Sequence, residues 1–156
     1  RRALPDEELH VVETLYTYEG GIGAAQRLLE RGCTGVVCGS DIIALGVIQG
    51  VRAAGRQVPQ DVSVIGYDDS PLIPMTNPPL TTVRQPVAAI CRAAVSTLVS
   101  LIEGGRAPDS EMLFMPDLIV RGSTAMAPRL AASGLPPATP VRGIPMGGLR
   151  PAPPAP

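Results

Sequence analysis

The stretch from residue 34 to residue 69 constrains the fold more than any other part of the chain. It reads TGVVCGSDIIALGVIQGVRAAGRQVPQDVSVIGYDD, in which two short apolar runs flank a long apolar segment of helical length. The short runs are rich in valine and isoleucine, which is typical of strands that are buried on both faces of a parallel sheet. The stretch therefore predicts a βαβ unit with a helix over 42–54 and a second strand over 62–65.

Each of the two apolar runs ends at an acidic turn. The first turn is Gly39-Ser40-Asp41 and the second is Gly66-Tyr67-Asp68-Asp69. In open α/β sheets, ligands bind in the crevice outside the carboxyl ends of the strands. We therefore expect both turns to border a ligand site. Asp41 also stands where a carboxylate can cap or begin the following helix, because the helix dipole favours negative charge there.

The rest of the chain continues the alternation of strands and helices. Thr17 is a plausible N-cap for the helix that follows it, and Gly46 and Gly50 share one helix face that allows another backbone to approach closely. The other expected elements are a strand over 10–16, an amphipathic helix over 20–31, a proline-rich loop over 70–79, a strand over 80–85, an apolar helix over 87–103 and a final strand from 112 to 120, kinked at Pro116.

Parallel strands would bring three corners of the chain to one sheet edge. These corners are Tyr16, Ser40-Asp41 and the turn from Tyr67 to Asp69. Together they would supply an aromatic ring, a hydroxyl group and up to three carboxylates. Carboxylates accept hydrogen bonds from hydroxyl groups, and a ring packs against the apolar face of a ligand. This set suits a hydroxyl-rich ligand such as a sugar or a nucleoside, although Asp69 fits a turn-forming role better than a second ligand contact.

Composition excludes several functional classes. The net charge of -1 gives no global attraction to nucleic acid or to an anionic membrane, and no apolar run reaches membrane-spanning length. The single histidine, His10, cannot build a histidine-based metal cluster, and the three cysteines form no C-x-x-C pair. We therefore expect no metal, no cofactor and no membrane partner, and a reducing, cytoplasmic location.

The last thirty residues differ from the rest. Nine of the chain's 18 prolines fall within 127–156, together with four glycines and no acidic residue. Such a composition buries too little apolar surface to offset the loss of chain entropy. We expect one domain over 1–126 and a disordered proline-rich tail over 127–156.

Three segments in the same order carry a family resemblance: CGSDIIALGVIQGVRAAGRQVPQDVSVIGYDDSPL, NPPLTTVRQPV and MPDLIVRGSTA. They resemble the sugar-binding core of the LacI/GalR family of bacterial transcription regulators, over about residues 12–125. The resemblance implies an α/β fold of the periplasmic-binding-protein type I class, with a parallel sheet flanked by helices and a ligand cleft between two subdomains. It implies that this chain holds the second subdomain and the helix over 87–103, whose family partner, the first subdomain, is absent here.

The resemblance also implies roles for individual residues. Asp68 is similar to the principal ligand-contacting acid of the family, and Tyr16 stands where members carry an aromatic ring that stacks on the effector. Ser40 occupies a position where many members carry an asparagine that contacts the effector, so the resemblance implies a ligand contact for Ser40. Gln85 falls where the chain crosses between subdomains, near the cleft. Asp41 fits a helix cap better than a direct ligand contact.

A homodimer is a further implication of the resemblance. Leu45 and the loop that contains Leu72 and Thr76 correspond to the dimer surface of the second subdomain. Family members bind DNA through an N-terminal helix-turn-helix, and no such segment is present in this chain. The expected function is therefore the effector-binding portion of a sugar-responsive repressor, which is not an enzyme.

Two alternatives come from other classes of protein. A periplasmic sugar-binding protein of a transport system shares the fold but needs a signal peptide, and the PPLTTVRQP and IVRGSTA segments favour the regulator. An enzyme with magnesium held by Asp41, Asp68 and Asp69 is the second alternative. The chain has no lysine and offers no nucleophile at the right corner, which counts against the enzyme.

Overall fold

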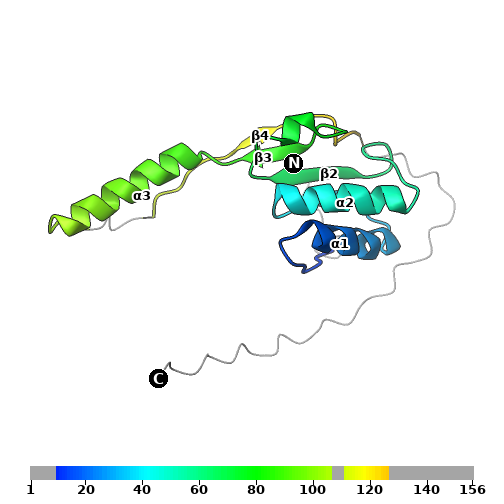
Figure 1. Ribbon diagram of the computed structural model, residues 1–156, viewed down its shortest axis with the longest axis horizontal. Helices are drawn as coiled ribbons and strands as arrows, with labels where there is room; N and C mark the ends of the chain where they lie inside the picture. Colours follow the sequence, from blue (N-terminus) through cyan, green and yellow to red (C-terminus); the bar gives the residue numbers. More distant parts are fainter. Residues whose placement is uncertain (1–9, 107–110, 127–156) are drawn as a thin grey trace, which may run out of the picture.

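The computed structural model describes residues 10–106 and 111–126, and the expectations for 1–9 and for the tail over 127–156 lie outside these ranges. A mixed α/β domain is formed (Figure 1). Its elements are α1 (Tyr18–Glu30), β1 (Gly35–Val37), α2 (Asp41–Ala53), β2 (Ser63–Tyr67), the 3-10 turn η2 (Ile73–Met75), β3 (Thr81–Arg84), α3 (Val87–Ile102) and β4 (Asp117–Ile119).

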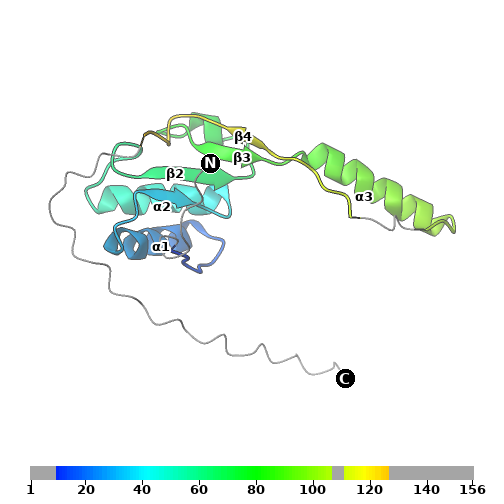
Figure 2. The ribbon, with the colours of Figure 1, turned by 180° about the vertical axis from the view of Figure 1, so that it is seen from behind.

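The sheet is predominantly parallel, as the sequence predicted. Its strand order is β1-β2-β3-β4; the first three strands run parallel, and β4 pairs antiparallel with β3 (Figure 2). The predicted βαβ unit is confirmed by β1, α2 and β2. Because the first three strands are parallel, their carboxyl ends meet at one edge of the sheet.

Helix α2 lies against β2, and α1 lies beside α2 (Figure 1). The two helices approach closely because glycines meet at their crossing. A Cβ on Gly46 would collide with the carbonyl oxygen of Tyr18, and one on Gly50 would lie 2.6 Å from the Cβ of Ala25. The role predicted for these two glycines is therefore confirmed. The N-cap at Thr17 is confirmed as well, since its hydroxyl accepts a hydrogen bond from the Gly20 amide at 3.0 Å.

The hydrophobic core lies between α2 and the sheet. Val47, Val51, Val64 and Leu80 are at most 1% exposed. These side chains come from α2, from β2 and from Leu80 directly before β3, so the core depends on the βαβ unit and the strand that follows it. Burial of this kind is the dominant favourable term in folding.

Two strand predictions need correction. Residues 10–16 run extended along the domain but form no strand, and residues 10–14 make no backbone–backbone hydrogen bond within the described part of the chain. Residues 112–115 are also outside the sheet, because β4 is limited to Asp117–Ile119. A β-branched sequence alone does not make a strand; a neighbouring strand must complete its hydrogen bonds.

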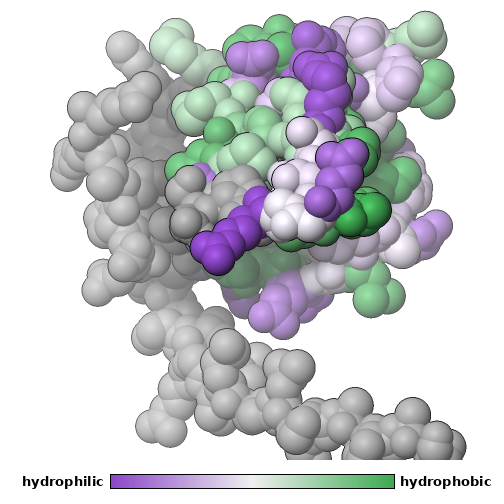
Figure 3. Space-filling view, turned by 90° about the vertical axis from the view of Figure 1, so that its left-hand side faces the viewer, coloured by the Kyte–Doolittle hydropathy of each residue, from purple (hydrophilic) through white to green (hydrophobic). Residues whose placement is uncertain are grey.

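Helix α3 projects away from the rest of the domain (Figures 1 and 2). None of its 16 residues is buried, although it is strongly apolar. The apolar helix expected over 87–103 is thus present, but it has no cover within the described residues. Figure 3 views the molecule from the side where α3 projects and shows hydrophobic residues gathered over much of this face. The exposed large side chains of α3 include Val87, Val95, Leu98 and Ile102.

Among the described residues, no helix combines the length and the apolar character that crossing a membrane requires.

Candidate functional site

The carboxyl ends of β1, β2 and β3 form the candidate site. The chain leaves these strands at Cys38, at Asp68 and at Gln85, and the parallel registers place all three exits on the same edge. Sequence reasoning predicted this edge from the acidic turns. The structure brings Asp68 and Gln85 into direct contact there, because Gln85 Nε2 donates to Asp68 Oδ1 at 3.1 Å.

Asp68 presents its carboxylate to solvent. The residue is exposed, and its backbone has a φ of 112°, a positive value that residues other than glycine adopt only uncommonly. Its amide donates to the carbonyl oxygen of Val83 at 2.9 Å, which fixes the turn against β3. Among the residues that the structure describes, Oδ1 alone has a side-chain partner, so the carboxylate keeps acceptor capacity for hydroxyl groups of a ligand.

Asp69, the next residue, forms ion pairs within the protein. Its oxygens pair with Arg84 and Arg121, each at 2.6 Å, and its side chain is only 6% exposed. Burial raises the pKa of Asp69, but the hydrogen bonds and positive charges of Arg121 and Arg84 outweigh burial and hold this pKa below its ordinary value. Asp69 is therefore a structural anchor of the turn, and sequence spacing gave no sign of its partner 52 residues away.

Ser40 and Asp41 have different roles at the start of α2. The Ser40 hydroxyl is the N-cap and accepts a hydrogen bond from the Ile43 amide at 3.3 Å. Of the two roles considered for Asp41, capping the helix or beginning it, the second is confirmed, because Asp41 occupies the first helical position while Ser40 is the cap. Its buried carboxylate accepts from the Thr82 hydroxyl at 2.6 Å and from the Ser70 amide at 2.8 Å. These bonds tie α2 to β3 and to the loop after β2.

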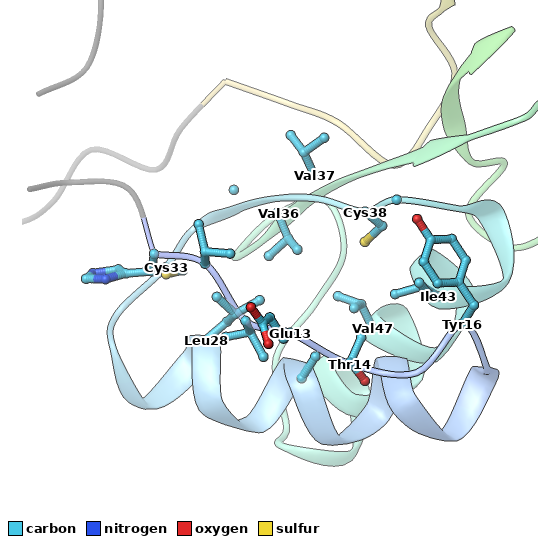
Figure 4. A pocket seen from close by; sticks show the side chains of 16 residues that line it. Glu13, Thr14, Tyr16, Leu28, Cys33, Val36, Val37, Cys38, Ile43 and Val47 are labelled. Carbon is cyan, nitrogen blue, oxygen red and sulfur yellow. The ribbon is translucent and has the colours of Figure 1, made fainter. Parts of the chain in front are cut away.

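Tyr16 reaches the same edge although its segment is not a strand. Its hydroxyl lies against Gly39, where an added Cβ would be 2.8 Å away. Figure 4 shows the ring above Ile43, beside the end of β1 at Cys38. The residue is 72% exposed, so one face of the ring is available to pack against a ligand.

A cavity of about 750 Å³ lies next to this edge, on the side of β1 away from β2 (Figure 4). Its walls come from the segment over 10–16, from β1, and from the facing sides of α1 and α2. The lining is mostly apolar and includes Cys38, whose burial raises the pKa of its thiol to about 12. Tyr16 belongs to the lining, but Asp68 and Gln85 do not.

The three residues expected at a dimer surface have different environments. Leu45 is half-buried and packs against the core, whereas Leu72 is 71% exposed. The Thr76 hydroxyl lies 2.8 Å from the carbonyl oxygen of Ile73 and accepts from the Leu80 amide at 3.2 Å. Thr76 therefore shapes the loop, and Leu72 is the side chain free to contact a partner.

The three carboxylates of the magnesium alternative do not converge. Asp41 is buried against Thr82, Asp69 is paired with arginines, and Asp68 alone faces solvent. Within residues 10–106 and 111–126, no group of three or more histidine, cysteine or acidic side chains is placed to hold a metal ion.

A model of the periplasmic binding protein-like domain matches residues 2–124. The chain belongs to this family. It is 59% identical over 128 residues to the HTH-type transcriptional regulator reg1 of Streptomyces lividans, covering 82% of this chain and 37% of the relative. The chain thus spans little more than a third of that relative's length. The resemblance noted in the sequence is confirmed, since the relatives are HTH-type transcriptional regulators.

Solved structures agree with this assignment. A LacI-family transcriptional regulator from Enterococcus faecalis V583 with bound ribose superimposes with a TM-score of 0.68 at 33% identity, covering 77% of this chain and 45% of that one. The transcriptional regulator CelR in complex with cellobiose gives a TM-score of 0.64 at 36% identity, covering 69% of this chain and 34% of that one. The periplasmic-binding-protein-like fold predicted from the sequence is therefore confirmed for this part of the protein.

Proposed function

We propose that this chain is part of the effector-binding core of a sugar-responsive LacI-family repressor. The observation that carries the proposal is the exposed carboxylate of Asp68, held against Gln85 at the carboxyl edge of a parallel sheet. The relatives support a regulator in preference to a transport protein, because they are transcriptional regulators and two of the structural neighbours contain a sugar. DNA binding would require a helix-turn-helix outside this chain.

The exposed groups at this edge have chemistry that suits a sugar. Asp68 would accept hydrogen bonds from ligand hydroxyl groups, and the Gln85 amide would keep the carboxylate in place and supply further polar atoms. Tyr16 would pack its ring against the apolar face of the sugar. Ser40 and Asp41 would support the site indirectly, because their side chains are buried and already hydrogen-bonded.

Effector binding would act on DNA through the relative position of two subdomains. A ligand shifts such an equilibrium only if it binds one arrangement more tightly than the other. Asp68 and Gln85 would provide this difference, because Gln85 is two residues from the start of α3, where the chain leaves the domain body. The ligand site and the connection between subdomains would therefore share one hydrogen bond.

Calorimetric titration of the chain with ribose, cellobiose and lactose tests the proposed site. We expect one of these sugars to bind, and Asp68→Asn to weaken that binding at least tenfold, the cost of about 1.4 kcal/mol expected when a charge-assisted hydrogen bond is lost. Asp61→Asn is the matched control. Asp61 lies at the opposite edge of the sheet and accepts from the Gln57 amide, which an asparagine oxygen can also do. Equal affinity of Asp68→Asn and the unmodified chain would refute the site.

A homodimer through the loop around η2 is part of the same proposal. Leu72 is exposed on this loop, and Met75 beside it is 82% exposed. Sedimentation should show that Leu72→Glu lowers the dimer fraction, because an interface core excludes charge. An unchanged dimer fraction would place the interface elsewhere.

A further inference from the structure

The turn that presents Asp68 contains two consecutive residues with positive φ. Asp68 has a φ of 112° and Asp69 has a φ of 55°. Such backbone conformations are uncommon for residues other than glycine, and they persist only where the surrounding contacts hold them in place. The direction of the Asp68 carboxylate therefore depends on the contacts that hold this turn.

Two hydrogen bonds hold Asp68 itself within the described part of the chain. Its amide donates to the Val83 carbonyl oxygen at 2.9 Å, and its Oδ1 accepts from Gln85 Nε2 at 3.1 Å. The bond to Gln85 is exposed, so water competes for both of its partners. The shorter bonds of the turn belong to Asp69, whose carboxylate forms two ion pairs at 2.6 Å.

The two arginines that pair with Asp69 differ in their exposure. The side chain of Arg84 is 53% exposed, whereas that of Arg121 is 15% exposed. Exposed ion pairs are weak because water and salt screen them, while hydrogen bonds between charged groups are strong and directional where water is excluded. The bond from Arg121 is therefore the one that fixes the turn.

Arg121 is itself held at the start of β3. Its Nη1 donates to the Leu80 carbonyl oxygen at 2.9 Å, and its amide donates to Thr81 Oγ1 at 2.9 Å. Its Nη2 donates to Asp69 Oδ1 at 2.6 Å. Because the guanidinium group is planar and its donors have a fixed geometry, Arg121 joins the start of β3 rigidly to the turn after β2.

We propose that Arg121 is a positioning residue of the sugar site, which sets the affinity by holding Asp68 in place through Asp69. This inference rests on the proposed function, because it takes Asp68 as the acid that contacts the ligand. Without Arg121, the turn would populate other backbone conformations in which the Asp68 carboxylate points elsewhere. The apparent affinity would then fall in proportion to the fraction of molecules that keep the binding-competent conformation.

Calorimetric titration of the 156-residue chain tests this role with whichever of ribose, cellobiose and lactose binds most tightly. Arg121→Met keeps a long side chain and removes the guanidinium group. We expect it to weaken binding about tenfold, the order of loss found when a group that orients a ligand-contacting residue is removed from a metal site.

Arg84→Met is the matched control, because it removes the same charge from the same carboxylate of Asp69 and leaves the less exposed bond from Arg121 intact. It should weaken binding about threefold or less. Equal losses in Arg84→Met and Arg121→Met would overturn the inference, since affinity would then follow the net charge and not the anchor.

A double-mutant comparison separates positioning from a general loss of structure. Arg121→Met should weaken binding less in the Asp68→Asn background than in the unmodified chain, because the charge-assisted bond that Arg121 positions is already lost there. Independent residues would instead give losses that multiply. Multiplicative losses would overturn the inference.

The side-chain amide signals of Gln85 provide a readout by NMR that needs no sugar. In Arg121→Met these signals should move toward those of a solvent-exposed glutamine, because the bond to Asp68 is lost, and unmoved signals would overturn the inference. If Arg121→Met folds poorly, Asp69→Asn combined with Arg121→Met should show the same effects without a buried unpaired carboxylate.

Failure of the proposed function gives a different result. The proposed site is refuted if no sugar binds the unmodified chain, or if Asp68→Asn leaves the affinity unchanged. The Gln85 signals still decide in that case whether Arg121 positions the turn.

Discussion

Helices α2 and α3 have similar apolar sequences and opposite environments. Eight of the 13 residues of α2 are buried, whereas none of the 16 residues of α3 is. Helix α2 has α1 on one side and β2 on the other, and α3 has no comparable neighbour among the described residues. Apolar content thus shows that a helix needs a partner, but it does not say whether this chain contains that partner.

The α1–α2 crossing is the feature most easily broken. Gly46→Ala should lower the free energy of unfolding by about 3 kcal/mol, because the new methyl group would overlap the Tyr18 carbonyl oxygen and force two backbones apart. Gly23→Ala in α1 is the control, since no atom lies within 4 Å of its added Cβ. It should stabilise the helix by up to about 1 kcal/mol. Urea unfolding measures both, and equal effects would contradict the close approach.

Truncation of one apolar side chain in each helix compares the two environments directly. Val47→Ala should cost about 2 kcal/mol, because Val47 is 1% exposed and the substitution leaves a cavity. Leu98→Ala should change the free energy of unfolding by no more than about 0.5 kcal/mol, because Leu98 is 57% exposed. A loss at Leu98 as large as that at Val47 would mean that α3 is covered in solution.

Acid should weaken the ion pairs that hold the turn after β2 to the ends of β3 and β4, next to α3. Asp69 pairs with Arg84, which ends β3 before α3, and with Arg121, which follows β4. The folded-state pKa of Asp69 is lowered, so its contribution to stability is present above the unfolded pKa of about 4 and is lost as pH falls through the folded pKa. The urea concentration at the unfolding midpoint should therefore fall less between pH 7 and pH 3 in Asp69→Asn than in the unmodified chain. An identical pH dependence would refute this role.

Local patterns in the sequence predicted most elements of the body. The apolar runs and their glycine and acidic stops located β1, α2 and β2, and the spacing of Gly46 and Gly50 predicted a close helix crossing. These features are decided by neighbours in the chain, by backbone sterics and by capping. Asp68 and Gln85 were expected near the cleft, and the structure places them in contact.

Features that depend on residues far apart in the chain could not be predicted from the sequence. The hydrogen bond between Asp41 and Thr82 spans 41 positions of the chain, and the one between Asp69 and Arg121 spans 52. The periodicity of hydrophobic residues within a helix or strand gives no information about pairs so far apart. The segment over 10–16 has the composition of a strand, yet no strand in the described part of the chain pairs with it. The same reason explains α3. Its apolar residues can be recognised in the sequence, but the part of the protein that would pack against them cannot.

An NMR titration of the chain with the sugar that binds most tightly by calorimetry tests the central claim most directly. If the effector site lies at the carboxyl edge of the sheet, the amide signals of Tyr16, Asp68 and Gln85 will shift together with one affinity. The signals of Ala53 and Asp61, at the opposite edge, will stay in place. Shifts confined to the opposite edge or to α3 would contradict the account.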